Sequence, residues 1–196
     1  MSSIYVAEKD LDKAISEAKR AIEQDPKQIE FYLHLANLYF LKKDLVRAEQ
    51  TLKEAMKRDE NSAKVRYALA EFYRRTGKIE LAEAELIEVT KFNPKDPNPY
   101  TALGNFYTSL KRMEEAEKQF IKAMEVDPKR IPSQIQLGDF YLIWGKKEKA
   151  VENYQKVIDA DSKNIPARAK LAEVFLNDHQ LDKASEAIEK LLEINP

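Results

Sequence analysis

The chain has 196 residues, of which 43% are hydrophobic and 34% are charged. Its 33 basic residues nearly balance its 34 acidic residues, so no overall field attracts nucleic acid or an anionic membrane. The absence of cysteine excludes disulfides, thiolate catalysis and cysteine-ligated zinc. No apolar run approaches the ~20 residues that a membrane-spanning helix needs, and the N-terminal residues lack the basic and apolar regions of a signal peptide.

One pattern of residues returns every 34 positions along the chain. A fixed period of roughly 20–50 residues predicts stacked repeats that share a continuous core, instead of one globular core. The clearest columns hold leucine, then glycine or alanine, then an aromatic residue, and finally alanine: Leu35, Leu69, Leu103, Leu137 and Leu171; Ala36, Ala70, Gly104, Gly138 and Ala172; Tyr39, Tyr73, Tyr107, Tyr141 and Phe175; Ala48, Ala82, Ala116, Ala150 and Ala184.

The first predicted element is an incomplete repeat over residues 1–28. Ala14, Ala21 and Pro26 fall in the same columns as later repeats, so this segment is expected to be mainly a second helix, with most of its first helix missing. Complete repeats are then expected, within one continuous domain, at 29–62, 63–96, 97–130, 131–164 and 165–196.

Each complete repeat is predicted to contain two amphipathic helices. In the third repeat, the apolar residues of 97–110 follow the spacing of one helical stripe, and those of 113–126 form a second stripe. Only Lys111 and Arg112 separate the two, so the helices are expected to pack as antiparallel neighbours.

Small residues are expected to let the paired helices approach closely. The glycine or alanine of each first helix is predicted to face the alanine column of the second helix. Gly77 and Gly145 fall in the turn between paired helices, where a positive φ is often required.

The turns between repeats have their own chemistry. An aspartate or asparagine recurs there and proline usually follows it, which prevents the helix from continuing. Where Glu60 and Ser162 replace proline, side-chain hydrogen bonds of Asp59 and Asp161 are expected to form the turn.

Taken together, these columns resemble the tetratricopeptide repeat over the whole chain. The resemblance implies an all-α fold, a right-handed superhelical α-solenoid of stacked antiparallel helix pairs. The family's first aromatic residue is kept only as Tyr32 and Tyr100, and Arg66, Gln134 and Arg168 replace it elsewhere. The irregular repeats also resemble bacterial arrays, some of them in envelope export systems. That likeness favours a bacterial source and an envelope or periplasmic location over the cytoplasm.

The C-terminal end also carries an expectation. The chain stops at Pro196, in a turn that elsewhere leads into another repeat, and the helix over 181–194 carries Ile188, Leu191 and Leu192 on an apolar face. A solenoid usually closes with a polar capping helix. We therefore expect a fragment of a longer protein whose uncapped ends promote self-association.

No catalytic, metal-binding or cofactor-binding constellation is apparent. His34 and His179 lie in different repeats, and four glycines cannot form a phosphate-binding loop. The pair Arg74-Arg75, with Lys78 nearby, is a candidate contact for an acidic ligand, although a solvated helix end is the simpler interpretation.

The resemblance implies that the first helices line a concave groove. Apolar, amide and charged groups alternate there, a mixture that suits an extended peptide, although the same residues also fit a plain solvated helix face. The predicted partner-binding residues are Leu33, Asn37, Phe40, Tyr67, Glu71, Arg74, Asn105, Thr108, Asp139, Ile143 and Glu173. The acids in this set favour a partner protein or peptide with basic character.

Three functions compete. The favoured one is a protein–protein interaction scaffold that binds a partner segment in its groove, without catalysis, cofactor, nucleic acid or membrane insertion. A self-assembling structural module is the second. The third is a targeting or regulatory region of an enzyme whose catalytic domain lies outside this sequence.

Overall fold

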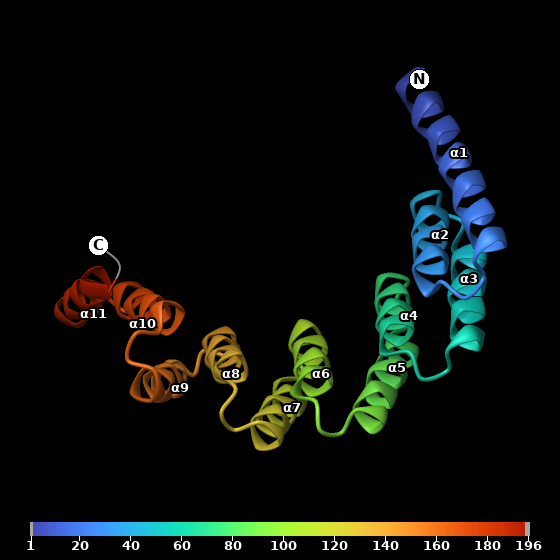
Figure 1. The fold of residues 1–196 in the computed structure, drawn as a ribbon. Helices are drawn as coiled ribbons and strands as arrows, with labels where there is room; N and C mark the ends of the chain where they lie inside the picture. Colours follow the sequence, from blue (N-terminus) through green and yellow to red (C-terminus); the bar gives the residue numbers. More distant parts are fainter. Residues whose placement is uncertain (1, 195–196) are drawn as a thin grey trace. The chain divides into compact units, whose positions relative to one another are not determined.

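The computed structural model describes residues 2–194, with side chains from residue 10 onward. Over that range the chain forms eleven α-helices and no strand, which confirms the predicted all-α class (Figure 1). The predicted turn residues Asn195 and Pro196 lie outside the described range. None of the described helices is long and apolar enough to cross a bilayer. The helices group into two compact units, Met1–Phe92 and Asn93–Pro196.

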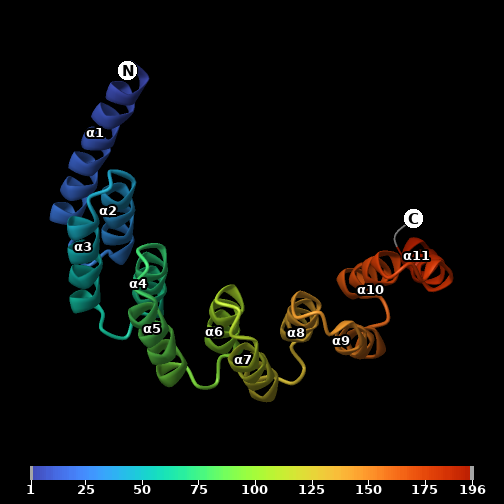
Figure 2. The same cartoon turned by 180° about the vertical axis from the view of Figure 1, so that it is seen from behind.

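The first unit contains α1 to α5. Its helices are α1 (Ser2–Gln24), α2 (Ile29–Leu41), α3 (Leu45–Arg58), α4 (Ala63–Arg75) and α5 (Ile79–Phe92). The pairs α2–α3 and α4–α5 are antiparallel, and α3 contacts both its partner α2 and the next first helix, α4 (Figures 1 and 2). α3 thus joins two first helices, which is how stacked repeats share one core.

The second unit repeats this arrangement with α6 to α11. Its helices are α6 (Pro97–Ser109), α7 (Met113–Val126), α8 (Ile131–Ile143), α9 (Lys147–Ala160), α10 (Ile165–Asn177) and α11 (Leu181–Ile194). Here α7 contacts α6 and α8, and α9 contacts α8 and α10. The predicted architecture of stacked antiparallel helix pairs is therefore present within each unit.

The N-terminal helix covers most of the segment expected to be an incomplete repeat, but without the turn seen in later repeats. In the later repeats the turn between paired helices lies at 42–44, 76–78, 110–112, 144–146 and 178–180, so the repeat pattern places one at 8–10. Instead, α1 runs through residues 8–10 without interruption. The residues before that position therefore continue directly into the expected second helix as one helix.

The turns between paired helices behave as predicted at both glycines. Gly77 and Gly145 have φ of 77°, and Lys43, Lys111 and His179 adopt positive φ values of 56–61° at the same position in the other repeats. In each turn a later N–H reaches back to the aromatic column, as when Lys78 donates to the Tyr73 carbonyl at 2.8 Å. This is the C-terminal helix cap that a left-handed residue allows.

The turns between repeats are also held as predicted where proline is missing. The Asn61 N–H donates to Asp59 Oδ1 at 3.2 Å, and the Asn164 side chain donates to Asp161 Oδ2 at 3.1 Å. Asn164 also accepts from the Ala167 N–H at 3.0 Å and so caps α10.

The alanine column is buried, as expected for a contact between paired helices. Ala48, Ala82, Ala116 and Ala150 are 0% exposed. However, a Cβ atom added at Gly104 would lie 3.0 Å from the Phe120 ring, and one at Gly138 would lie 2.5 Å from the Tyr154 ring. At these two glycines the ring four residues after the alanine on the second helix lies nearest to the small residue, and the contact with the alanine column stays a prediction.

At this contact, the sizes of the two residues, which stand 16 positions apart in the sequence, are matched. Where the second helix carries an aromatic ring, the first helix has glycine, and where it carries an aliphatic side chain, the first helix has alanine. The pairs are Ala36 with Leu52, Ala70 with Leu86, Gly104 with Phe120, Gly138 with Tyr154, and Ala172 with Ile188. The volume removed on one helix makes room for the ring on the other.

Candidate functional site

The first unit has a pocket between its two first helices, α2 and α4. This α2–α4 pocket has a volume of about 160 Å³. Four of the predicted partner-binding residues line it, namely Leu33, Asn37, Phe40 and Glu71. The remaining lining residues are Ala36, Leu52, Ala68, Phe72 and Arg75.

The second unit has a matching pocket between α6 and α8. This α6–α8 pocket has a volume of about 120 Å³ and contains four more predicted residues, namely Asn105, Thr108, Asp139 and Ile143. Phe120, Gln136 and Phe140 complete its lining.

The two pockets are built from equivalent positions of the repeat. Every residue that lines the α6–α8 pocket stands 68 positions, or two repeats, after a residue that lines the α2–α4 pocket. An amide (Asn37 or Asn105) and an acid (Glu71 or Asp139) occupy the same places in both. The repeat therefore produces the same kind of cavity in each unit.

The rims of the pockets differ. In the first unit the Arg75 guanidinium lies 3.8 Å from the centre of the Phe40 ring, a cation–π contact. In the second unit the equivalent residues are Thr108 and Ile143, and Ile143 is 64% exposed. The Thr108 hydroxyl donates to the Gly104 carbonyl at 2.9 Å, so it presents its methyl group and one oxygen instead of a ring.

Both floors are aromatic but differ in the second-helix residue. In the first unit Phe72 packs edge-on against Phe40, with ring centres 6.1 Å apart, and Leu52 is the second-helix residue of the lining. In the second unit Phe140 and Phe120 lie 4.9 Å apart. Sequence reasoning did not include these floor residues. The pairing of Gly104 with Phe120, 16 residues apart, is the signal that predicts which second-helix side chain enters the pocket.

The acids at the two pockets already have partners. The Arg74 guanidinium donates to Glu71 at 2.7 and 2.8 Å, and this hydrogen bond holds the pKa of Glu71 below its usual value. Asp139 accepts from the Tyr154 hydroxyl at 2.7 Å and pairs with Lys170 at 3.0 Å. Burial, with the bond to Asp139, raises the pKa of Tyr154, so this phenol stays neutral and donates.

The other predicted partner-binding residues do not line either pocket. Tyr67 is half-buried on α4, Arg74 is held by Glu71, and Glu173 is exposed on α10. Of the candidate acidic-ligand contact, Arg74 pairs with Glu71 and Lys78 with Glu49 at 2.6 Å, whereas Arg75 stacks on the Phe40 ring. Among the described residues, no three His, Asp or Glu side chains are grouped so that they could hold a metal ion.

Solved structures of similar fold come from tetratricopeptide-repeat proteins. A tetratricopeptide repeat protein from Parabacteroides merdae matches with a TM-score of 0.64 and 18% identity, over 100% of this chain and 77% of its own. YrrB, described as a TPR protein with an unusual peptide-binding site, matches with a TM-score of 0.55 and 20% identity, over 93% of this chain and 94% of its own. MamA matches with a TM-score of 0.59 and 21% identity, over 82% of this chain and 94% of its own. At these identities the likeness shows the fold alone.

The sequence itself points to a family. No curated protein matches it. A family profile, that of the cilia and flagella-associated protein 70 C-terminal domain, matches residues 1–195. Neither the family match nor the similar structures support the expected bacterial source, envelope location or fragment status. With nearly its whole length matched, the chain belongs to the cilia and flagella-associated protein 70 C-terminal domain family of tetratricopeptide-repeat domains.

Proposed function

We propose that the α2–α4 and α6–α8 pockets hold side chains of a partner protein segment, and that the domain is a non-catalytic interaction scaffold. The observation that carries this proposal is the recurrence of one pocket design at equivalent positions of both units. Helix packing alone does not explain this recurrence. Packing needs only the apolar floor, whereas each pocket also has an amide and an acid at equivalent positions. Convergent polar groups around an apolar surface are typical of ligand sites.

The amides are suited to a peptide backbone. Asn37 and Asn105 are exposed at their pockets, and an amide side chain offers two donors and one acceptor oxygen. A partner main chain presents the complementary carbonyl and N–H groups. We propose that each amide orients the segment bound at its own pocket, while the apolar floor of that pocket takes a side chain.

The rims give the pockets different preferences. The Phe40 ring and Arg75 guanidinium favour a planar side chain or one that carries a carboxylate. Thr108 and Ile143 favour an aliphatic side chain. Each pocket is therefore proposed to prefer a different kind of partner side chain.

Of the predicted acids, only Glu173 is still proposed to attract a basic residue of the partner. Glu71 and Asp139 have intramolecular cations in Arg74 and Lys170, so attraction from them is already offset. Affinity is proposed to come mainly from apolar burial and backbone hydrogen bonds, with a modest dependence on salt.

Selection of peptides from a random display library on the purified chain tests the proposal. Selected peptides should bind the wild type and lose affinity by about tenfold, or ~1.4 kcal/mol, for Phe40→Ala with Ile143→Ala. The matched control is Lys118→Ala with Lys122→Ala on α7, outside both pockets. Peptides that bind the pocket variant as tightly as wild type, or that lose affinity only with the control pair, would refute the proposal.

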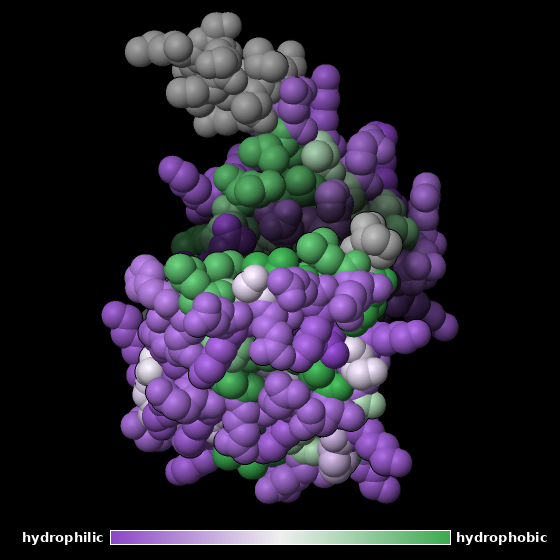
Figure 3. Space-filling view, turned by 90° about the vertical axis from the view of Figure 1, so that its left-hand side faces the viewer, coloured by the Kyte–Doolittle hydropathy of each residue, from purple (hydrophilic) through white to green (hydrophobic). Residues whose placement is uncertain are grey.

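Self-association is a second candidate, favoured by apolar exposure on α11. Leu181 and Leu192 are 67% and 56% exposed, whereas Ile188 and Leu191 are half-buried. Figure 3, which looks onto the side of α10 and α11, shows hydrophobic residues in narrow stretches between larger hydrophilic areas. Light scattering should show mass rising with concentration, and Leu181→Lys with Leu192→Lys should remove the rise. A wild type that stays monomeric at every concentration excludes this candidate.

A further inference from the structure

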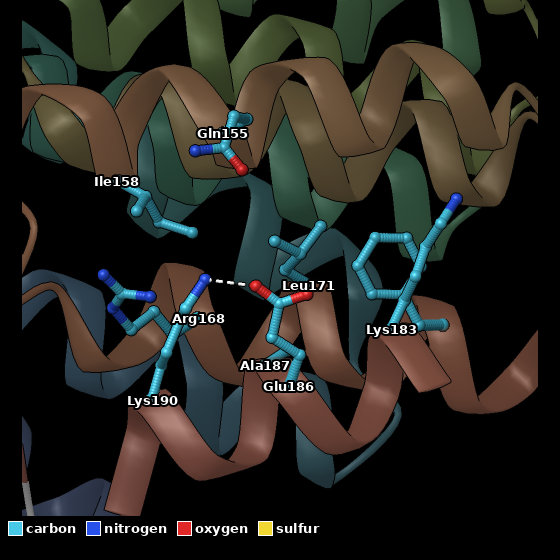
Figure 4. Close-up of a pocket in the computed structure, with 9 residues that line it drawn as sticks. Gln155, Ile158, Arg168, Leu171, Lys183, Glu186, Ala187 and Lys190 are labelled. Carbon is cyan, nitrogen blue, oxygen red and sulfur yellow. Dashed lines mark hydrogen bonds and ion pairs between the residues drawn. The ribbon is translucent and has the colours of Figure 1, made fainter. Parts of the chain in front are cut away.

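A larger groove lies within the second unit, away from the α6–α8 pocket. It has a volume of about 410 Å³ between α9 and α11, with α10 as its floor (Figure 4). We call it the α9–α11 groove. Its lining residues are Gln155, Ile158, Arg168, Leu171, Phe175, Lys183, Glu186, Ala187 and Lys190.

The charges of this groove are unbalanced. Three cations and one acid line it, and Glu186 is already bonded to Lys190. That leaves Arg168 and Lys183. Figure 4 shows Arg168 beside Ile158 toward one end and Lys183 toward the other, with Leu171 and Ala187 between them. Two cations are thus separated by an apolar floor.

Arg168 lacks a carboxylate that the fold supplies elsewhere. Three repeats earlier, Arg66 donates to the carbonyl of Glu60 at 3.0 Å and to the Glu85 carboxylate at 2.9 Å. Arg168 makes the first of these contacts, donating from Nε to the Ser162 carbonyl at 2.9 Å. The residue equivalent to Glu85 is Ala187. Among the described residues, no acid replaces it.

Lys183 lacks its carboxylate for a separate reason. One repeat earlier, Lys149 lies 4.9 Å from the centre of the Tyr141 ring and pairs with Glu117 at 2.9 Å. Lys183 keeps the aromatic contact, 5.5 Å from the Phe175 ring centre. The position of Glu117 is taken by Val151. Within the described part of the chain, Lys183 is therefore left with an aromatic neighbour and no acid.

From these two missing carboxylates we propose that the α9–α11 groove binds an acidic segment of a partner protein. Its carboxylates take the places that Glu85 and Glu117 fill in the equivalent repeats, one at Arg168 and one at Lys183. An aliphatic side chain between them lies on Leu171 and Ala187. Charge-assisted bonds over an apolar floor give both attraction and register. This site is independent of the α2–α4 and α6–α8 pockets.

Fluorescence anisotropy with a labelled peptide of alternating glutamate and leucine tests the proposal. The full chain should bind it about tenfold or more tightly than the same peptide with lysine in place of glutamate, and binding should weaken as salt rises. Arg168→Gln with Lys183→Gln should reduce affinity by about tenfold. Lys156→Gln, on α9 but outside the groove, makes the same kind of charge change and should leave affinity unchanged.

A restored carboxylate provides the second arm. Val151→Glu places an acid where Glu117 stands relative to Lys149, so it should pair with Lys183 and lower peptide affinity about as much as Lys183→Gln alone. Circular dichroism checks that each variant remains helical. The proposal is overturned if the wild type does not bind the glutamate peptide, if the lysine peptide binds equally well, or if the double glutamine variant binds like wild type.

Discussion

The α2–α4 pocket and the α6–α8 pocket occupy the same repeat positions, yet they present different chemistry. Both keep the amide and the acid, Asn37 with Glu71 in one and Asn105 with Asp139 in the other. The rim changes from a cation stacked on a ring to two aliphatic groups. The backbone of the repeat therefore fixes where a pocket forms, whereas a few side chains decide the chemistry of its rim.

The floors show a second difference, which concerns stability. In the first unit Ala36 pairs with Leu52, and in the second Gly104 pairs with Phe120, with Gly138 and Tyr154 following in the next repeat. A ring under glycine fills the same space as a smaller side chain under alanine. Mixing the two solutions costs stability, because a ring under alanine overpacks the contact and an aliphatic side chain under glycine leaves a void.

The largest expected effect comes from adding one methyl group to the second unit. Gly138→Ala places a Cβ 2.5 Å from the ring of Tyr154, which is 0% exposed and cannot swing away. Overpacking of about 3 kcal/mol, less ~1 kcal/mol of improved helix propensity, leaves roughly 2 kcal/mol of destabilisation. Gly104→Ala, with 3.0 Å to Phe120, should cost less. Urea unfolding followed by circular dichroism compares them; equal stability of all three proteins contradicts the packing argument.

The converse change in the first unit should cost somewhat less. Leu52→Phe brings a ring against the Ala36 methyl group, and we expect about 1–2 kcal/mol of destabilisation. Ala36→Gly with Leu52→Phe reproduces the Gly104–Phe120 pair and should recover most of the loss, apart from the helix-propensity cost of glycine. Unfolding midpoints of the single and double variants measure the recovery. Additive losses in the double variant would mean that the two residues do not touch.

Exchange of the rims tests whether they set the preference of each pocket. Phe40→Thr with Arg75→Ile gives the α2–α4 pocket the rim of the α6–α8 pocket. Peptides selected on the wild type through their planar or carboxylate-bearing residue should lose about tenfold in affinity, ~1.4 kcal/mol. Isothermal titration gives the dissociation constants, with Lys118→Ala as the control. Unchanged affinity for every selected peptide would show that the rims do not discriminate.

The smallest expected effect compares two acids that also stand 68 residues apart. Hydrogen bonds from Lys53 and Lys78 lower the pKa of Glu49 from 4.5 to about 2. For Glu117, burial raises the pKa, but bonds from Lys149 and Tyr141 outweigh it and leave a net lowering. A depressed carboxyl pKa stabilises the fold above its unfolded value, and the contribution is lost as pH falls from about 4.5 toward 2.

The experiment on these acids is a pH series of urea unfolding. Glu49→Gln should lower stability at pH ~7 by about 1 kcal/mol, a figure kept small because Lys53 and Lys78 are 57% and 46% exposed. Its stability should then fall less than that of the wild type between pH ~5 and ~2.5. Glu117→Gln should show the same trend with a smaller change. A variant whose stability falls with acid as steeply as the wild type would rule out Glu49 as a source of the pH dependence.

The sequence by itself determined the repeat, the helix pairs and the turns. These features depend on residues close along the chain. Apolar spacing placed the helix later seen at Met113–Val126, and the glycines at 77 and 145 marked turns that require positive φ. The buried alanine column follows in the same way, because helical periodicity alone puts one side of each helix against its neighbour. The family assignment rests on the same columns.

Only the tertiary structure decided which predicted groove residues belong together. Tyr67, Arg74 and Glu173 share the first-helix pattern with Asn37 and Asn105, yet they lie outside the pockets. An ion pair such as Asp139–Lys170 depends on a contact between helices that periodicity does not specify. Arg168 and Lys183 lack the carboxylate partners that Arg66 and Lys149 have. The sequence does not show this, because those partners lie on other helices and only the packing brings them close.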